Sequence, residues 1–250
     1  MEDDLLLRYS RQILLPEIDL AGQMRLADSA VLLLGLGGLG SVVSMYLAAA
    51  GVGNLILVDN DNVELSNLQR QIVHTTDRIG QKKVESAKLN LSALNPNTEI
   101  TTFDRILDEH DFDQVLPDVD IIVDATDNFE SRFFINRQSL KHMKPLVSGA
   151  AIRLEGQISV FNSNAKSPCY ECLYKDDTTD PSASCSESGV VAPLLGIIGS
   201  IQAMEVLKLI VGFGENLEGR LLLLDSSSME WHSVSLRKDP QCNACSKPTS

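Results

Sequence analysis

The last third of the chain carries two Cys-x-x-Cys pairs, Cys169/Cys172 and Cys242/Cys245. Four thiolates in this spacing are typical ligands of tetrahedral structural zinc sites, and they leave no position open for a catalytic water. Either pair alone would also suit a redox motif. Two pairs that bracket one segment favour zinc, and such a metal would attach the C-terminal tail to the rest of the fold.

A second chemical signal is the glycine-rich segment Gly35-Leu36-Gly37-Gly38-Leu39-Gly40, which follows a short apolar run. Gly35, Gly37 and Gly40 match the pattern G-x-G-x-x-G, in which glycines permit a tight turn and the close approach of a phosphate. Asp59 ends the next apolar run, 24 residues after Gly35, and its carboxylate suits ribose hydroxyls. Taken alone, the segment predicts a site for a nicotinamide or flavin dinucleotide.

Charged residues near the ends of later elements indicate a different nucleotide. Arg70 follows the second strand, Lys83 begins the next helix, and Asp127 comes where a later strand ends. In an open parallel sheet these places converge on one crevice at the carboxyl ends of the strands. Cations and carboxylates gathered there suit a magnesium-bound triphosphate, whose charge must be neutralised while its phosphates are held in line. The pyrophosphate of a dinucleotide would not require them.

The elements that must position these residues alternate between strand and helix in the front half of the chain. Apolar runs predict strands at 30–34, 55–59, 100–103, 119–125 and 145–148, with helices at 41–50, 83–94 and 129–142. This order predicts an α/β fold with a doubly wound, Rossmann-like parallel sheet. After residue 150 the pattern favours an antiparallel-rich half with strands at 152–161, 220–225 and 231–236 and a helix at 193–211.

We expect a single domain over residues 1–250, with an N-terminal helical segment at 1–29, a nucleotide-binding half at 30–150 and a second half at 151–250 that holds the zinc site. A net charge of −13 disfavours nucleic acid and anionic membranes as partners. The acidic N-terminus lacks the pattern of a secretory signal, and the paired cysteines suit a reducing compartment. We therefore expect a cytoplasmic protein.

The chain resembles the ubiquitin-activating-enzyme superfamily in its bacterial adenylyltransferase branch, typified by ThiF, MoeB and HesA. The resemblance spans residues 8–245 and rests on both cysteine pairs and on the stretches Arg8-Tyr9-Ser10-Arg11-Gln12, Gly35-Leu36-Gly37-Gly38-Leu39-Gly40, Asp59-Asn60-Asp61, Ser66-Asn67-Leu68-Gln69-Arg70-Gln71, Gly80-Gln81-Lys82-Lys83 and Ala125-Thr126-Asp127-Asn128. It implies an enzyme that uses ATP, Mg²⁺ and Zn²⁺ and adenylates the C-terminal Gly-Gly carboxylate of a ubiquitin-like sulfur carrier protein. Residues 151–250 would then bind the carrier, and a second subunit would complete a homodimer.

The resemblance also implies roles for individual residues. Gly38 would contact the nucleotide through its backbone, Asp59 would bind ribose, and Asp127 would bind magnesium. The expected nucleotide-binding residues are Gly35, Gly37, Gly38, Gly40, Asp59, Asp61, Ser66, Asn67, Leu68, Gln69, Arg70, Lys83, Asp127 and Asn128. The expected catalytic residues are Arg11, supplied by the second subunit, together with Arg70, Lys83, Asp127 and Cys185.

Cys185 matches a residue that thiamine-branch members link covalently to the activated carrier, and an ordinary exposed thiol is the other interpretation. The stretch 147–153 resembles the molybdopterin branch more than the thiamine branch. A sulfurtransferase or cysteine desulfurase is the expected sulfur donor. Two alternatives stay open: an NAD-dependent oxidoreductase, favoured by the glycine segment and Asp59, and a non-catalytic module that recruits a carrier, which the cluster of charged residues disfavours.

Overall fold

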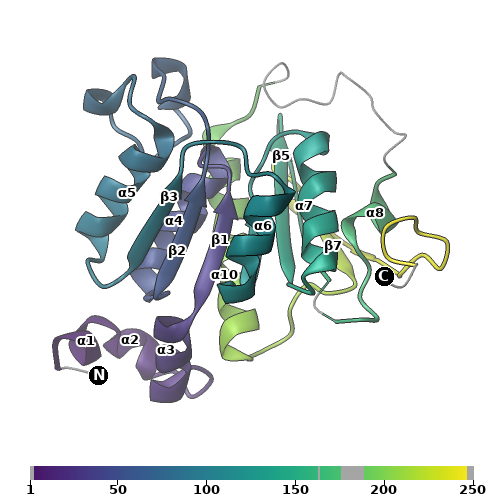
Figure 1. Cartoon of the computed structure of the whole chain (residues 1–250), viewed down its shortest axis with the longest axis horizontal. Coiled ribbons are helices and arrows are strands. Elements are labelled where there is room, and N and C mark those ends of the chain that lie inside the picture. The colour runs from purple at the N-terminus through teal and green to yellow at the C-terminus, as the bar shows by residue number, and fades with distance from the viewer. Residues whose placement is uncertain (1–2, 163, 176–188, 247–250) are drawn as a thin grey trace.

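The computed structural model describes residues 3–162, 164–175 and 189–246 (Figure 1). One eight-stranded sheet crosses the molecule, in the spatial order β3 (Glu99–Phe103), β2 (Asn54–Val58), β1 (Ala30–Leu34), β4 (Ile121–Asp124), β5 (Leu146–Ile152), β6 (Glu155–Phe161), β7 (Arg220–Asp225) and β8 (Glu230–Ser235). The α-helices of the described residues are α1 (Asp3–Arg8), α2 (Ser10–Ile13), α3 (Asp19–Asp28), α4 (Gly38–Ala50), α5 (Lys83–Leu94), α6 (Glu109–Val115), α7 (Phe129–Lys141), α8 (Tyr170–Leu173) and α10 (Ala192–Val211). Short 3-10 helices are η1 (Leu65–Asn67), η2 (Thr76–Arg78) and η3 (Leu116–Asp118).

Apolar side chains pack into one cluster on each face of the sheet. Every residue of β1 is buried. On one face Leu33 joins Leu47 of α4 and Ile198 of α10. On the other face Leu32 packs in the cluster that includes Phe112 of α6. Successive residues of β1 therefore belong to opposite cores, as a strand covered by helices on both faces requires.

The front half has the predicted doubly wound topology. Strands β1 to β4 and the first part of β5 run parallel, and β1 lies between β2 and β4. The winding direction reverses between β1 and β4, which opens a crevice at the carboxyl ends of these strands. The predicted strands at 30–34, 55–59, 100–103 and 119–125 are confirmed to within two residues at each end, and the helix at 83–94 is confirmed.

β5 joins the parallel half of the sheet to the antiparallel half. Leu146 pairs with Ile122 of β4, and the strand then continues to Ile152 while it pairs antiparallel with β6. The predicted end of this strand at residue 148 is wrong, because residues 149–151 also pair with β6. These residues are small and lack an apolar pattern, so the sequence does not indicate that they belong to the strand. β6, β7 and β8 are antiparallel, as predicted.

Two helical regions differ from what periodicity alone indicates. α6 has seven residues, too few to show a helical apolar period, and the sequence pattern does not predict it. It is nevertheless well capped, since the Asp108 carboxylate accepts a hydrogen bond from the backbone N–H of Asp111 at 2.9 Å. The described part of the predicted N-terminal segment at 1–29 contains three short helices, α1, α2 and α3.

Among the described residues, α10 is the one helix that is long and apolar enough to cross a membrane, judged by length and composition. Half of its apolar window is buried inside the protein, where Leu194 and Ile198 join the core cluster that includes α4. Glu205, which is 1% exposed, accepts hydrogen bonds from the Lys208 ammonium at 2.6 Å and the Leu217 backbone N–H at 2.7 Å. These contacts indicate a core helix, and its bounds fit the helix predicted at 193–211.

Two glycines after β1 are required by close backbone contacts. Gly35 has a φ of +91°, and a Cβ on it would lie 2.7 Å from the Ala125 carbonyl oxygen. A Cβ on Gly40 would lie 1.9 Å from the Gly35 carbonyl oxygen. The lack of both side chains lets α4 start directly beside the ends of β1 and β4, so that the N-terminus of α4 faces the crevice.

This contact yields a prediction for Gly40→Ala. The added methyl group must displace backbone, so we expect a loss of about 1–3 kcal/mol in the free energy of unfolding and weaker nucleotide binding. Gly196→Ala is the matched control, because Gly196 lies within α10 with no atom within 4 Å of its added Cβ. That change should stabilise the helix by about 0.5–1 kcal/mol. Urea unfolding and ATP titration check both, and a Gly40→Ala protein as stable as Gly196→Ala would contradict the assignment.

Candidate functional site

The inner cavity, of about 280 Å³, opens at the carboxyl ends of β1, β2 and β4. The predicted nucleotide-binding residues that line it are Gly35, Gly37, Gly38, Asp59, Asp61, Arg70, Lys83, Asp127 and Asn128. They come from the turns after β1, β2 and β4, from the segment after η1, and from the start of α5. The doubly wound topology therefore brings together residues that lie far apart in the sequence, between positions 35 and 128.

The carboxylate of Asp59 holds the glycine segment by a backbone hydrogen bond. One carboxylate oxygen accepts a hydrogen bond from the Leu36 backbone N–H at 2.7 Å, and the other accepts one from the Asp61 N–H at 2.9 Å. Burial raises the pKa of the Asp59 carboxyl, and the nearby Lys83 ammonium opposes that shift. His74 supports the same turn, with Nε2 at 3.1 Å from the Leu36 carbonyl oxygen. The glycine segment is thus fixed before any nucleotide binds.

Lys83 and Arg70 bring positive charge to the inner cavity. The Lys83 ammonium lies 2.8 Å from the Asp61 carboxylate, and its side chain is 6% exposed whereas that of Asp61 is 61% exposed. Arg70 donates a hydrogen bond through Nη1 to the Ser66 carbonyl at 3.1 Å. A buried ammonium whose partner is solvated can bind a more highly charged anion, because the partner remains hydrated if the pair opens.

The N-terminus of α7 closes the opposite side of the cavity. Asn128 caps this helix by accepting a hydrogen bond from the Ser131 backbone N–H at 2.9 Å. Asp127 precedes the cap and lines the inner cavity. Carboxylate oxygens are ligands that Mg²⁺ prefers, and the residues here fit the predicted metal in chemical type. Backbone N–H groups at the same helix end favour an anion.

Arg132, one helical turn into α7, is a site residue that the sequence patterns did not single out. It is 7% exposed, and its guanidinium donates a hydrogen bond to the Thr126 carbonyl at 2.6 Å. Its Nε lies 4.0 Å from the carboxylate of Asp124, which is 1% exposed and accepts a hydrogen bond from Ser148 Oγ at 2.7 Å. This buried pair fixes a positive charge beside Asp127.

A second group missed by sequence patterns is apolar. It lines the inner cavity at the end nearest β3 and α6 and comprises Ile106, Leu107, Phe112, Phe134 and Ile135, with Arg105 beside it. Arg105 is held by a two-pronged ion pair with Asp111 of α6. The segment 105–107 follows β3 and therefore lies at the same edge of the sheet as the other turns. This position after a strand is the one feature by which the sequence could have identified it.

Five of the predicted nucleotide-binding residues do not line the inner cavity: Gly40, Ser66, Asn67, Leu68 and Gln69. Asn67, 9% exposed, accepts a hydrogen bond from the Glu64 backbone N–H at 3.1 Å and so shapes the turn at η1. The Ser66 carbonyl holds Arg70. Ser66 and Asn67 thus support the segment that carries Arg70, and direct contact of any of the five with a nucleotide stays a prediction.

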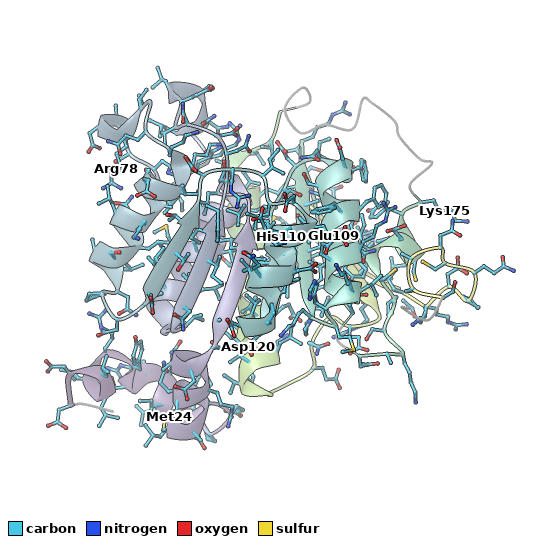
Figure 2. All side chains as sticks on the ribbon, viewed as in Figure 1. Met24, Arg78, Glu109, His110, Asp120 and Lys175 are labelled. Atoms are coloured by element: carbon cyan, nitrogen blue, oxygen red, sulfur yellow. The ribbon has the colours of Figure 1, made fainter. Side chains whose placement is uncertain are left out.

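One predicted catalytic residue, Arg11, stands apart from the inner cavity. Arg11 is exposed on α2, beside Gln12, whose amide donates to the carbonyl of Ala50 at 3.0 Å. Ala50 ends α4, and Gly38 begins this helix of 13 residues at the cavity, which places Arg11 about 20 Å away. Figures 1 and 2 show the neighbouring α3, with Met24, at the edge of the molecule opposite Arg78. Cys185 lies outside the described residues.

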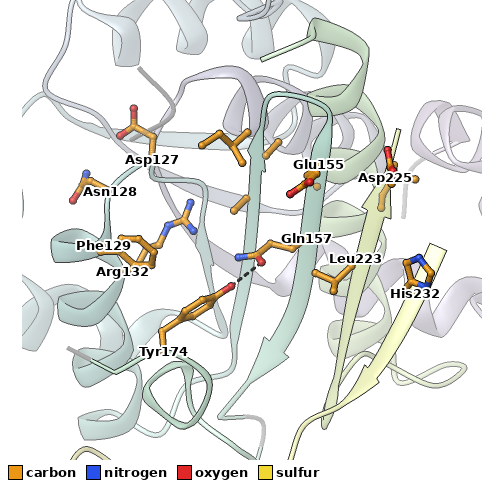
Figure 3. A pocket seen from close by; sticks show the side chains of 15 residues that line it. Asp127, Asn128, Phe129, Arg132, Glu155, Gln157, Tyr174, Leu223, Asp225 and His232 are labelled. Carbon is orange, nitrogen blue, oxygen red and sulfur yellow. Dashed lines mark hydrogen bonds between the residues drawn. The ribbon is translucent and has the colours of Figure 1, made fainter. Parts of the chain in front are cut away.

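A larger outer cavity, of about 440 Å³, adjoins the inner one (Figure 3). Its walls come from α7, from β5 to β8 and from the residue that follows α8, with Phe129, Gln157, Tyr174 and Leu223 among them. The two cavities share Asp127, Asn128, Arg132 and Ala151. A molecule in one cavity can therefore approach a molecule in the other at the N-terminus of α7.

The four paired cysteines converge on one point, as predicted. Their Sγ atoms all lie within 4.8 Å of one another, at 3.7 Å for Cys169–Cys172, 3.6 Å for Cys169–Cys242 and 3.5 Å for Cys172–Cys245. A tetrahedral zinc with bonds of about 2.3 Å requires sulfur–sulfur edges of about 3.8 Å. A disulfide requires about 2.05 Å. The cluster therefore fits a zinc ion and not two disulfides.

The electrostatic setting of the cysteines also suits a metal. A hydrogen bond with Cys169, helped by the backbone N–H groups of Asp239 and Cys169, lowers the pKa of Cys172 to about 5. The same hydrogen bond and burial raise the pKa of Cys169. Closely packed thiols cannot all ionise without a counter-cation, which a divalent metal supplies.

Comparison with known proteins identifies close relatives. The ThiF family model matches residues 9–244. The molybdopterin-synthase adenylyltransferase of Escherichia coli is 44% identical and covers 98% of this chain and 98% of its own. That of Haemophilus influenzae is 50% identical and covers 92% and 94%. The adenylyltransferase and sulfurtransferase MOCS3 of Drosophila virilis is 42% identical over 98% of this chain, which spans 55% of that protein.

Solved structures share the fold. Escherichia coli MccB with ATP has a TM-score of 0.79 and 26% identity, covering 90% of this chain and 69% of its own. The microcin C7 biosynthetic enzyme MccB in complex with N-formylated MccA has a TM-score of 0.82 and 25% identity, covering 95% and 74%. PaaA has a TM-score of 0.82 and 27% identity, covering 96% and 76%.

The cysteine geometry yields a metal prediction. The purified protein should contain one zinc per chain, and Cys242→Ser should lower both zinc content and melting temperature. Zinc-finger peptides gain about 10–16 kcal/mol from the metal, and we expect a smaller effect here because the metal joins two segments of an already folded protein. Cys185→Ser, which changes the one cysteine that is in neither Cys-x-x-Cys pair, is the matched control and should keep its zinc. Metal analysis that finds no zinc, with disulfides instead, would refute the prediction.

Proposed function

Since the chain belongs to the ThiF family, we propose that it uses ATP to adenylate the C-terminal carboxylate of a ubiquitin-like sulfur carrier protein. One observation carries the proposal: the inner cavity, with its cations and carboxylates, shares Asp127 and Arg132 with the outer cavity. A nucleotide and a peptide tail can therefore meet end to end. The relatives named molybdopterin-synthase adenylyltransferase favour the molybdopterin pathway over the thiamine pathway.

The lining of the inner cavity supports a different position for each part of ATP. The apolar end formed by residues 106–107, 112 and 134–135 suits the adenine base, which offers two flat faces. Asp59 lies between this end and the glycine segment, where its carboxylate can accept hydrogen bonds from ribose. The N-terminus of α4, Arg70 and Lys83 then surround the phosphates. Asp127 is the residue that would hold magnesium, which neutralises phosphate charge when bound.

The reaction needs no activated side chain. The carrier carboxylate is already an anion at neutral pH, and one of its oxygens attacks the α-phosphorus of ATP. A carboxyl–phosphate bond forms, the bond between the α- and β-phosphates breaks, and pyrophosphate leaves with the electron pair. The residues orient the two substrates and stabilise the charge that develops on the phosphates, as Lys83 and Arg70 are placed to do. Arg132, at the junction, offsets the charge of the incoming carboxylate.

The site disfavours both alternative functions. A nicotinamide-dependent oxidoreductase would use the glycine segment and Asp59 but has no need for Arg70, Lys83 and Asp127 around the same cavity. A module that only recruits a carrier would need neither cavity. Magnesium-dependent ATP–pyrophosphate exchange that requires a Gly-Gly-terminated carrier distinguishes adenylation from both.

We also propose a homodimer, a cytoplasmic location and a sulfur donor of the sulfurtransferase or cysteine desulfurase class. The dimer would bring Arg11 of one chain to the phosphates bound by the other, since its own cavity is out of reach. Apolar side chains exposed near Arg11 support a subunit contact there: Leu7, Leu14, Leu15, Leu20 and Met24. The location suits four thiols that must stay reduced to bind metal.

Asp127→Ala tests the adenylation site. The loss of one electrostatic contact to the reacting phosphates commonly slows catalysis about a hundredfold or more, so exchange should fall by that factor while the fold persists. Asp118→Ala, at an exposed aspartate of η3, is the control and should match the parent. Exchange within about threefold of the parent would remove Asp127 from the site. Background exchange in the parent with every Gly-Gly carrier, together with NAD binding, would instead favour the oxidoreductase.

Mixed dimers test Arg11. An Arg11→Ala chain and an Asp127→Ala chain should each be inactive alone. After subunit exchange in equal amounts, the rate should recover to about a quarter of the parent value, because half of the dimers are mixed and each keeps one complete site. No recovery, with mixed dimers confirmed by native mass spectrometry, would mean that Arg11 acts within its own chain or not at all.

A further inference from the structure

Tyr174 forms one wall of the outer cavity and directly follows the cysteine-bearing helix α8. Its hydroxyl donates a hydrogen bond to Gln157 Oε1 at 2.7 Å (Figure 3). Its ring meets the Phe129 ring edge-on, at a centroid separation of 5.7 Å. We propose that Tyr174 positions the tail of the carrier and that the four-cysteine site holds Tyr174 in place, so that metal binding and tail binding are coupled.

The cysteine pair and Tyr174 belong to one tight turn. The Cys172 backbone N–H donates to the Cys169 carbonyl at 3.0 Å, and the Tyr174 N–H donates to the Tyr170 carbonyl at 3.0 Å. Cys172 precedes Tyr174 by two positions, and its Sγ also accepts a hydrogen bond from the Asp239 N–H at 3.4 Å. A metal bound through both thiolates of this turn would therefore fix the backbone from which the Tyr174 side chain projects.

Side chains extend this unit to α7. Glu171, between the two cysteines, is 8% exposed and accepts hydrogen bonds from Arg137 Nε at 3.0 Å and Asn136 Nδ2 at 3.3 Å. The Tyr170 backbone N–H donates to Asn136 Oδ1 at 2.9 Å. Asn136 and Arg137 lie on α7, the helix whose first turn borders both cavities. A shift of α8 would thus move one wall of the outer cavity relative to α7.

Packed aromatic rings complete the connection between the cysteine site and the cavity. Tyr170 contacts Tyr174 at a centroid separation of 5.0 Å, Phe133 at 5.7 Å and Phe161 at 5.6 Å. Packed aromatic side chains have few alternative arrangements, so a displacement at Tyr170 is passed on to Tyr174. The position of the cavity wall therefore depends on the order of the cysteine turn.

This inference rests on the proposed function, which places the carrier tail in the outer cavity. A tail that ends in Gly-Gly offers backbone amides and no side chains near its end. The Tyr174 and Phe129 rings and the Gln157 amide are groups that can contact such a backbone. Because a coupling free energy is the same from both directions, a metal that orders the wall for the tail must itself be held more tightly when the tail is bound.

Steady-state kinetics test the role of Tyr174. Tyr174→Ala should raise the KM for the carrier about tenfold and leave the KM for ATP unchanged, whereas Tyr174→Phe, which keeps the ring, should stay within about threefold of the parent. Leu91→Ala is the matched control, because Leu91 is buried on α5, away from the cysteine turn, and lines neither cavity. It should lower stability without raising the carrier KM. A Tyr174→Ala protein with the parent's carrier KM, or a carrier KM raised equally by Leu91→Ala, would overturn the proposal.

Zinc release to a colorimetric chelator tests the coupling without measuring turnover. The intact carrier should slow release from the zinc-loaded protein about fivefold, and a carrier that lacks its last two glycines should not. In Tyr174→Ala the two carriers should give equal release rates. Equal rates in the parent would overturn the coupling. A parent that shows no carrier-dependent exchange would overturn the proposed function itself, so the two failures are distinct.

Discussion

The close contact between the glycine segment and the backbone after β4 is the constraint on which the site depends. The Gly35 N–H donates to the Val58 carbonyl at 2.9 Å, and the Ala125 N–H donates to the Leu34 carbonyl at 2.9 Å. The turns after β1, β2 and β4 therefore form one continuous edge. Since no Cβ intervenes at Gly35 or Gly40, α4 begins against this edge and directs its N–H groups into the inner cavity. Backbone, more than side chains, sets where a phosphate can lie.

Charge at this edge is balanced before a substrate arrives. The chain has a net charge of −13, yet the inner cavity contains buried cations, each matched by a carboxylate: Lys83 with Asp61 and Arg132 with Asp124. An unpaired buried cation would cost several kcal/mol. The two ion pairs differ in how easily the cation can leave its carboxylate, because Asp61 is largely solvated whereas Asp124 is 1% exposed. Lys83 can therefore turn to a phosphate, while Arg132 remains fixed as a wall of the junction.

The sequence predicts those parts of the site that lie in local patterns. The glycine segment, Asp59 and Asp127 each follow a buried strand, so periodicity and topology suffice to place them together. Arg132 and the apolar residues at 106–107 carry no such pattern, because their place depends on how α6 and α7 pack across the sheet. The extension of β5 to Ile152 was also hidden, since its small residues are specified by their pairing with β6. Arg11 lies about 20 Å from the inner cavity of its own chain, so that cavity does not account for its predicted catalytic role.

The two halves of the chain specify their cavities in different ways. The parallel half forms the inner cavity from successive strand-to-helix turns, each of which is short and can be predicted from a local sequence pattern. The antiparallel half builds the outer cavity from residues distant in sequence, such as Gln157 and Leu223, and joins segments 73 residues apart through Cys169 and Cys242. Contacts of such long range lose more chain entropy on closing, and a metal shared by the four cysteines would offset that loss. The two Cys-x-x-Cys pairs are the local sequence pattern that indicates where these distant segments of the antiparallel half meet.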